Sequence, residues 1–428
     1  MTLSKNSNKT EELSISKNML WNSAGSVTYL ACQWLVTILV VRLGNGFDAA
    51  GVLSLAMSVT GIFGTFANYK MGTYQISDVK RENTMSEYLG FRCLTLFLCG
   101  LACIIYALFT CPPATILTVV LFYIYKAVGL IIDILHGEDQ LARRMDYIGI
   151  SMILQGCLSL TAFAIAFGFT QDINIAIVAM TLAALTVLFA YDIPKASRFT
   201  RVCINLSKSK AIHFFRTSFL AVLASVMASA IFVVPKQFVA VSMGDAMLGA
   251  YSSVAAPALI VQMGAVYLYG PLLDIFAGYY VSGNKQGFIT LLKRVVAGII
   301  LISICASLLL LFIGPWALEL LFGSDISQYE YLLQPVILST ATTAFLWFFS
   351  DLMISIRDFR ANFAGNIAAM ACVLALSIPM INIFGLNGVS FAGALACVAG
   401  VLVLLVFLFV HLRNFPVVEK GATDCAVE

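Results

Sequence analysis

The chain has 428 residues, of which 61% are hydrophobic and only 11% are charged, and its mean hydropathy is +0.94. Soluble globular domains carry roughly 25% charged residues, so this composition excludes a soluble protein and indicates one that resides in a lipid bilayer. The formal net charge of +3 is small and does not point to a nucleic-acid partner.

Twelve long apolar segments follow one another along the chain. A bilayer core about 30 Å thick requires roughly 20 apolar residues per helix. Backbone in lipid must satisfy its own hydrogen bonds, so each segment is expected to be a transmembrane helix. The predicted spans are residues 19–41, 49–69, 88–109, 113–135, 147–169, 173–193, 212–242, 247–270, 288–313, 332–356, 363–384 and 388–411.

The basic residues predict the orientation of these spans. Counted by alternate loops, 22 of the 25 Lys and Arg residues lie on the side of the two termini, and only Arg42 lies on the other side. Lys and Arg accumulate in cytoplasmic loops, so both termini are predicted to be cytoplasmic. A missing or extra helix would have scrambled this alternation, so the bias also supports twelve spans.

The longest connection between spans covers residues 194–211 and is basic and polar. It separates a predicted N-terminal six-helix lobe, residues 1–193, from a C-terminal six-helix lobe with a short tail, residues 212–428. Both lobes begin in the cytoplasm, so they would be parallel repeats related by a pseudo-two-fold axis along the membrane normal. We therefore predict an all-α polytopic membrane protein with two six-helix lobes around a central cavity.

Weak internal similarity agrees with this duplication. Residues 41–44 (VRLG) resemble residues 241–244 (VSMG), and each is followed by a glycine, Gly51 or Gly249, where the next helix opens.

A second pair of similar segments opens the fifth and eleventh spans. Residues 144–149 (RMDYIG) resemble residues 360–365 (RANFAG). In this motif Asp146 or Asn362 is expected to cap the following helix, and the glycine is expected to permit close helix packing.

Lys126 and Lys236 lie inside spans, away from their cytoplasmic ends, and Arg42 lies at the outer end of the first span. A charge at bilayer depth costs at least about 2.5–3.5 kcal/mol and usually faces a cavity or a partner. Lys126 is the deepest, roughly 20 Å from one end of its span and roughly 15 Å from the other. It is predicted to line the cavity, with an ion pair to another helix as the alternative.

Lys236 and Arg42 are the other candidates for substrate binding in the cavity. Lys236 follows Pro235, which favours a kink. It lies only about 10 Å from the outer end of its span, so snorkelling to the interface is the alternative. For Arg42, at the outer end of the first span, the alternative is also an interfacial position.

The acidic residues are candidates for coupling or gating. Asp133 and Asp351 lie near the cytoplasmic ends of the fourth and tenth spans, which correspond in the two halves, and Asp274 lies near the cytoplasmic boundary. The deep charges are thus cationic, whereas a cavity for cationic drugs would require a deep carboxylate. We expect an anionic substrate, such as a phosphate or pyrophosphate head group.

Motifs for catalysis are absent from the sequence. There is no G-x-x-x-x-G-K-S/T phosphate loop, no H-E-x-x-H and no G-x-S-x-G, so we expect no ATPase activity, no catalytic residues, no metal and no cofactor. The outer loops are short, the longest being residues 314–331. A membrane glycosyltransferase or polymerase usually presents a large outer loop, so that class stays the less favoured alternative to transport.

The N-terminal quarter carries a recognisable pattern. It consists of residues 17–26 (KNMLWNSAGS), Gln33, residues 41–44, Gly51, and residues 74–78 (YQISD). This pattern resembles the O-antigen and capsular polysaccharide flippases, the Wzx-like branch of the multidrug/oligosaccharidyl-lipid/polysaccharide exporter superfamily. The similarity is densest over the first 90 residues.

The resemblance implies a two-lobe transporter without enzymatic activity. Such a protein moves an undecaprenyl-pyrophosphate-linked oligosaccharide, the repeat unit of lipopolysaccharide O-antigen or capsule, from the cytoplasmic to the periplasmic leaflet of the bacterial inner membrane by alternating access. Its implied partners are this lipid-linked substrate, membrane lipids and other polysaccharide assembly proteins. Family members carry cations in the central cavity, and Lys126 and Lys236 match them in type and region.

Two alternatives within the same superfamily stay open. One is a cation-coupled multidrug exporter of the same fold, against which the deep lysines argue. The other is the flippase of the lipid-linked peptidoglycan precursor, whose members usually have fourteen helices rather than twelve.

Overall fold

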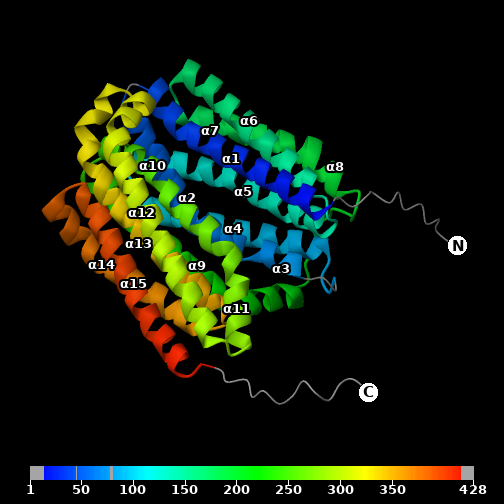
Figure 1. The fold of residues 1–428 in the computed structure, drawn as a ribbon. Coiled ribbons are helices and arrows are strands. Elements are labelled where there is room, and N and C mark those ends of the chain that lie inside the picture. Colours follow the sequence, from blue (N-terminus) through cyan, green and yellow to red (C-terminus); the bar gives the residue numbers. More distant parts are fainter. Residues whose placement is uncertain (1–13, 45, 78–80, 416–428) are drawn as a thin grey trace, which may run out of the picture. The chain divides into compact units, whose positions relative to one another are not determined.

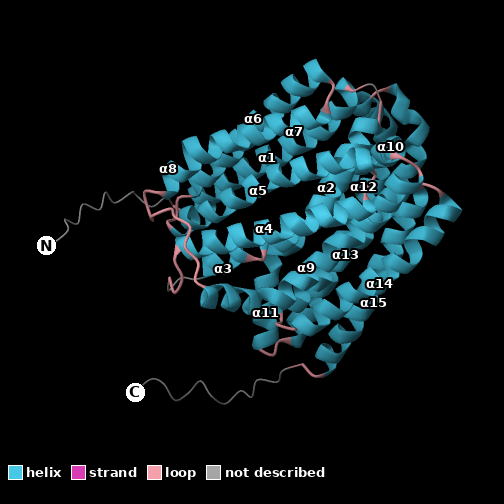
Figure 2. Cartoon of the chain, turned by 180° about the vertical axis from the view of Figure 1, so that it is seen from behind, coloured by secondary structure: helices cyan, strands magenta, loops and turns pink. Residues whose placement is uncertain are grey.

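The computed structural model describes residues 14–44, 46–77 and 81–415 (Figure 1). Within these ranges the chain is helical and contains no strand, and short loops join most of the helices (Figure 2). The helices are α1 (Ile15–Leu43), α2 (Asp48–Asn68), α3 (Met71–Ser77), α4 (Met85–Thr110), α5 (Pro113–Leu141), α6 (Met145–Thr170), α7 (Ile173–Val187), the π-helix η1 (Leu188–Asp192), α8 (Ile193–Ala196), α9 (Lys208–Ser242), α10 (Asp245–Tyr269), the 3-10 helix η2 (Gly270–Leu272), α11 (Leu273–Val281), α12 (Lys285–Phe322), the 3-10 helix η3 (Ser324–Leu332), α13 (Leu333–Ser355), α14 (Phe359–Phe384) and α15 (Asn387–Arg413).

Twelve helical segments of the described chain are long and apolar enough to cross a membrane. Large apolar side chains on them are exposed, among them Phe109, Phe169 and Phe312. So many exposed large apolar side chains are unfavourable in water but suit a lipid environment. The prediction of an all-α, multi-pass membrane protein with twelve spans is therefore confirmed.

Two segments differ from the sequence prediction. The stretch 314–331, predicted as a loop, contains the end of α12, which continues through Pro315 to Phe322, and most of η3. Pro315 lies inside α12 and removes one backbone hydrogen bond, but the following residues, WALELLF, are mostly good helix formers and continue the helix. The short helix α3 was not predicted, because seven residues are too few to show an apolar period.

The helices group into two compact units. The first comprises Met1–Leu39, Ala67–Ile104 and Val120–Thr217, and the second comprises Val40–Phe66, Ile105–Val119 and Ser218–Glu428. These boundaries cut through α1, α2, α4, α5 and α9 and do not follow residues 194–211. The division into lobes 1–193 and 212–428 stays a prediction about the two sequence halves.

In the first unit, glycine allows α1 and α6 to cross at close range. A Cβ atom added to Gly149 would lie 2.3 Å from the carbonyl oxygen of Trp21, and one added to Gly25 would lie 2.5 Å from the Cα of Gly149. Real Cβ atoms do not approach that closely, so the crossing requires glycine on both helices. The prediction of close packing at Gly149 is confirmed.

The first turn of α6 is capped by a residue of another helix. Asn18 of α1 accepts a hydrogen bond from the backbone N–H of Met145 at 2.9 Å and donates to the carbonyl of Arg143 at 3.0 Å. Asp146 instead pairs with Arg144, whose Nη2 lies 2.7 Å from Asp146 Oδ2. The prediction that Asp146 caps this helix is wrong, because its carboxylate has the stronger partner in a guanidinium.

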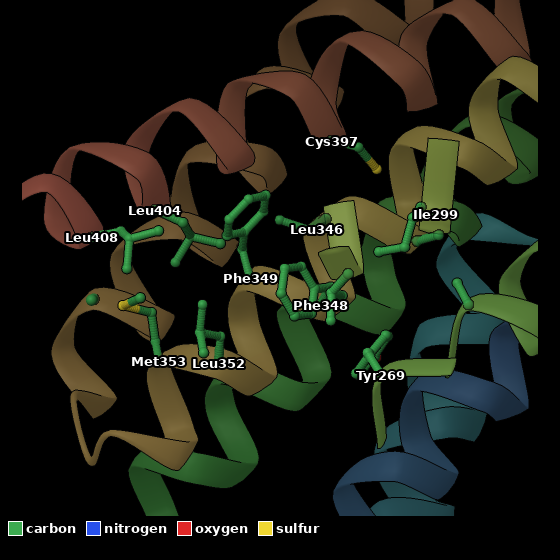
Figure 3. Close-up of a cluster of buried hydrophobic side chains, with 14 of the residues drawn as sticks. Tyr269, Ile299, Leu346, Phe348, Phe349, Leu352, Met353, Cys397, Leu404 and Leu408 are labelled. Atoms are coloured by element: carbon green, nitrogen blue, oxygen red, sulfur yellow. The ribbon is translucent and has the colours of Figure 1, made fainter. Parts of the chain in front are cut away.

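In the second unit, α13 is the most enclosed helix. Its Phe348 and Leu352 are completely buried between Tyr269 of α10 and the α15 residues Leu404 and Leu408 (Figure 3). Helix α14 packs along α15 through Gly365, where an added Cβ would lie 2.5 Å from Leu404 Cγ. This core holds α13, and with it Asp351, in a fixed register.

The cap of α14 also differs from the prediction. Asn362 is buried within the helix, and Asp358 caps it by accepting a hydrogen bond from the N–H of Ala361 at 2.9 Å. Asp358 is the better cap because it lies just before the first helical residue, where backbone N–H groups have no intrahelical acceptor.

Candidate functional site

Lys126 lies in α5, in the first unit, and its side chain is half-buried. No hydrogen bond or ion pair joins it to any residue in the described part of the chain, so the alternative of an ion pair finds no partner there. One turn further on, an added Cβ at Gly129 would meet no atom within 4 Å. Residues three apart share a helix face, so the face of α5 that carries Lys126 is open at the position of Gly129.

The residue before Lys126 fixes the rotation of α5 about its own axis. Tyr125 is buried, and its hydroxyl accepts a hydrogen bond of 2.7 Å from the Nε2 of Gln33 in α1. With Tyr125 held against α1, the side chain of Lys126 is directed to a different face of α5. Gln33 belongs to the N-terminal pattern recognised in the sequence, and here it has a positioning role.

Asp133 lies two turns beyond Lys126 on α5, and its partner is a buried arginine. Arg92 of α4 is completely buried and places Nη2 3.4 Å from Asp133 Oδ2. It also donates to the carbonyl of Ala67 at 2.9 Å and to Asn68 Oδ1 at 2.8 Å. Asp133 itself is 48% exposed, so it neutralises a buried charge while it stays open to its surroundings.

Arg92 is a completely buried cation, and it is one of the 22 basic residues counted on the side of the two termini. A signal for its depth was present, because residue 92 falls four residues inside the predicted span 88–109. The structure separates two types of basic residue within spans: Arg92 has three hydrogen-bond acceptors, whereas Lys126 has no acceptor in the described chain.

Lys236 lies in α9, in the second unit, directly after Pro235. Its side chain is half-buried and has no hydrogen bond or ion pair within the described ranges. The next residue, Gln237, is buried, accepts from the hydroxyl of Tyr106 and donates to the carbonyl of Thr110 at 3.1 Å. These bonds fix α9 to the C-terminal end of α4 beside Lys236.

Arg42 caps the end of another helix. Its Nε donates to the carbonyl of Leu321 at 2.9 Å, and its Nη2 donates to the carbonyls of Glu319 at 3.1 Å and of Leu320. The last carbonyls of a helix lack intrahelical donors and carry partial negative charge, so a cation stabilises them. The contact with α12 accounts for Arg42 without a ligand, and we do not include this residue in the proposed substrate site.

The remaining acidic candidates belong to the second unit. Asp351 is half-buried and accepts a hydrogen bond of 2.8 Å from the hydroxyl of Tyr269. It occupies a position on α13 like that of Asp133 on α5, but with a phenol instead of a guanidinium as partner. The backbone of Asp274 lies in α11, and its side chain is outside the part that the structure describes.

Lys126 and Lys236 share one chemical property, an ammonium group in a span without a carboxylate beside it. Each can offer three hydrogen-bond donors to a ligand, and phosphate oxygens are suitable acceptors. Among the described residues, no group of three or more His, Cys, Asp and Glu side chains is arranged to hold a metal ion. The arrangement suits the binding of an anion.

Solved structures with a similar fold identify the architecture. An inward-facing multidrug resistance MATE family transporter of the MOP superfamily is 14% identical, with a TM-score of 0.69 over 90% of this chain and 96% of that one. The lipid II flippase MurJ, in an inward closed conformation, is 12% identical, with a TM-score of 0.70 over 91% of this chain and 87% of that one. This chain has the MOP superfamily fold.

A curated relative supports the more specific resemblance, that to the polysaccharide flippases. The capsular polysaccharide biosynthesis protein CapF of Staphylococcus aureus is 24% identical over 380 residues, which cover 87% of this chain and 93% of CapF. No family model matches the chain. The resemblance to the Wzx-like polysaccharide flippases of the MOP superfamily is confirmed.

Proposed function

We propose that this protein is a flippase for an undecaprenyl-pyrophosphate-linked oligosaccharide. It moves the repeat unit of an O-antigen or a capsule from the cytoplasmic to the periplasmic leaflet of the bacterial inner membrane, with both of its termini in the cytoplasm. The observation that carries this proposal is Lys126, a half-buried cation within a span that has no partner in the described chain and lies one helical turn from an open position at Gly129. The name of CapF supports polysaccharide assembly as the context.

The physical problem in flipping is the polar head group. Sugars and pyrophosphate lose their hydrogen bonds to water when they enter hydrocarbon, and an unpaired charge there is very costly. A cation fixed in a water-filled passage replaces part of the lost hydration of the pyrophosphate. The prenyl chain stays in lipid during the movement, so only the head group requires a polar path.

The multidrug exporter is the second candidate, because the MATE transporters share the fold. A site for cationic drugs would require a carboxylate free to bind them. Asp133 is paired with Arg92 and Asp351 is bonded to Tyr269, whereas the half-buried Lys126 and Lys236 have no partner in the described chain. Three further carboxylates within spans, Glu138, Asp139 and Asp192, are almost completely buried and are not accessible to a drug in this structure. The balance of charge therefore favours the anionic substrate.

The proposal is tested with the purified protein in liposomes that contain a labelled pyrophosphate-linked oligosaccharide lipid. Wild type should equilibrate the label between leaflets faster than protein-free vesicles do. Lys126→Ala and Lys126→Glu should lower the rate at least about tenfold, which corresponds to ~1.4 kcal/mol in the barrier, and Lys126→Arg should retain part of it. Lys293→Ala is the matched control, because Lys293 is an exposed lysine of α12.

Two results would overturn the proposal in different ways. Normal flipping by Lys126→Ala would exclude Lys126 as the anion-binding residue. Failure of wild type to accelerate flipping, in vesicles where it moves a cationic drug, would favour the multidrug exporter. Lys236→Ala in the same assay tests the second lysine separately.

A further inference from the structure

The first unit contains a group of buried acids that the proposed substrate site does not use. Glu138 and Asp139 lie at the end of α5, and Asp192 ends the π-helix η1. Their exposed fractions are 5%, 1% and 1%. Carboxylates are almost never fully buried unless they are paired, so three of them together require an explanation.

The hydrogen-bond acceptors in this group outnumber the donors. Glu138 Oε2, Asp139 Oδ1 and Asp192 Oδ2 are buried and accept no hydrogen bond in the described chain. Leaving a buried acceptor without a donor costs about 1–3 kcal/mol, and more when it is charged.

A fourth acceptor comes from a different helix and is not an acid. Gln75 of α3 is completely buried, and its Nε2 donates to Glu138 Oε1 at 3.5 Å. Its Oε1 has no donor and lies against α5, where an added Cβ at Gly137 would be 2.4 Å away. A neutral amide directed into the acids with an unsatisfied oxygen indicates that a donor belongs in the group.

The basic groups around these acids are few and mostly occupied. Arg81 is more than half exposed and lies 3.8 Å from Glu138 Oε2, and His136 Nε2 lies 3.4 Å from Asp192 Oδ1. Arg144 is bound to Asp146.

The surrounding phenols and two further cations, Lys195 and Arg198, do not supply the missing donors either. Lys195 lies over the rings of Tyr147 and Tyr191, with its Nζ 4.5 and 5.3 Å from their centroids, and Arg198 reaches the hydroxyl of Tyr147 at 3.5 Å. The hydroxyl of Tyr191 is buried without a hydrogen-bond partner in the described chain. Asp139 thus has mainly acidic electrostatic neighbours, Glu138, Asp146 and Asp192, with His136 as the basic one.

We propose that Gln75, Glu138, Asp139 and Asp192 form a proton-binding site, and that this proton is the coupling ion of the transport proposed above. One bound proton removes one negative charge and converts an acceptor into a donor for a neighbouring unsatisfied oxygen. No metal-binding arrangement of His, Cys, Asp and Glu occurs among the described residues. The coupling part of this inference rests on the proposed flippase function, whereas the proton site does not.

The local backbone supports a functional reading of the site. Asp192 is placed by a single π-helical turn, and such turns inside α-helical segments are frequent at functional sites. Asp133 and Asp351, the coupling candidates predicted from the sequence, already have donors in Arg92 and Tyr269, so they require no proton to satisfy them.

The proton site is tested by infrared difference spectroscopy of the full-length protein between alkaline and acidic pH. Wild type should show a protonated-carboxyl C=O band that appears on acidification. Asp139→Asn and Asp192→Asn should each lose or shift this band, whereas Asp325→Asn, which removes an exposed carboxylate in η3, should keep it unchanged. A band that is the same in wild type and in both buried-site variants would overturn the site, and water molecules would then be the missing donors.

The coupling is tested in the flipping assay with an imposed pH gradient. Flipping by wild type and by Asp325→Asn should change at least about threefold with the gradient, and flipping by Asp139→Asn should not respond to it. A wild-type rate that ignores the gradient would overturn coupling even if the infrared band is present. If wild type flips nothing while the band behaves as expected, the flippase proposal and its coupling fail and the proton site stands.

Discussion

At the residue scale, the partners of each charge decide its role. Arg92 is completely buried with three acceptors, Arg42 is exposed on the end of α12, and Lys126 has no partner in the described chain. All three are basic residues in or at the end of a span, and their residue type alone does not distinguish them. Substitutions of these residues should therefore have different effects: loss of Arg92 should lower protein stability, whereas loss of Lys126 should lower transport.

Arg92→Met should destabilise the protein, because it leaves the carbonyl of Ala67 without this donor and removes the partner of Asp133. We expect a loss of about 1–3 kcal/mol, since Asp133 is half exposed and water can partly replace the guanidinium. The thermal midpoint in detergent measures it. Lys126→Ala should leave the midpoint nearly unchanged, and a fall equal to that of Arg92→Met would show that Lys126 is structural.

A hydrogen-bonded chain of Tyr280, His411 and Asp358 should make stability pH-dependent. The Tyr280 hydroxyl lies 2.8 Å from His411 Nδ1, and His411 Nε2 lies 2.7 Å from Asp358 Oδ2. Burial acts to raise the pKa of Asp358, but hydrogen bonds from His411 and from the N–H groups of Ala361 and Arg360 outweigh it, so the pKa lies below its usual value.

An acid whose pKa is lower in the folded state than in the unfolded state stabilises the fold at pH values above the unfolded-state pKa, which is about 3.9 for Asp. This contribution is lost as the pH falls through the folded-state pKa. Asp358→Asn should lower the thermal midpoint at neutral pH, and the difference from wild type should shrink below about pH 4. Asn still caps α14, so Asp358→Ala should cost about 1 kcal/mol more. A difference that is constant with pH would contradict the ionic contribution.

At the element scale, glycine determines which helices approach most closely. In the second unit an added Cβ at Gly51 of α2 would lie 1.7 Å from the carbonyl oxygen of Asp245, and one at Gly249 of α10 would lie 2.0 Å from that of Phe47. These glycines are the pair that the sequence repeat singled out, and they lie in one helix crossing. The start of α2 and the start of α10 are therefore in backbone contact.

The crossing of α2 and α10 can be tested by cross-linking. The hydroxyl oxygens of Ser54 and Ser252 are 2.5 Å apart, so Ser54→Cys with Ser252→Cys, in a background without native cysteines, should form a disulfide in high yield. Each single cysteine is a control, and adding Gly249→Leu should lower the yield by displacing α10.

If the two helices separate during alternating access, the disulfide should stop flipping and a reductant should restore it. Full flipping by the cross-linked protein would contradict separation at this point.

At the scale of the whole molecule, the predicted topology has a direct test. Cys203 is exposed between α8 and α9, and Asp325 is exposed in η3, with an odd number of spans between them. A membrane-impermeant thiol reagent should label Asp325→Cys in intact cells, and it should label Cys203 only after permeabilisation. Labelling of Cys203 in intact cells would invert the predicted orientation, which rests on the asymmetry of Lys and Arg.

The sequence by itself determined the twelve spans and the helical class. Each of these depends on the free energy of a single segment in lipid, because a transmembrane helix satisfies its backbone hydrogen bonds internally. The glycines of the close crossings could also be anticipated, since a missing side chain is visible in the sequence. These features require no knowledge of the neighbouring helices.

Only the tertiary structure decided which polar groups meet. The acceptors of Arg42 on α12 are 277 to 279 residues away in the chain, Asp133 is 41 residues from Arg92, and Asp192 is 56 residues from His136. A buried polar group is stable only with its partner in place. The pairing of Arg92 and the lack of hydrogen-bond donors around Asp139 thus arise from packing of the helices, which local hydrophobicity does not encode.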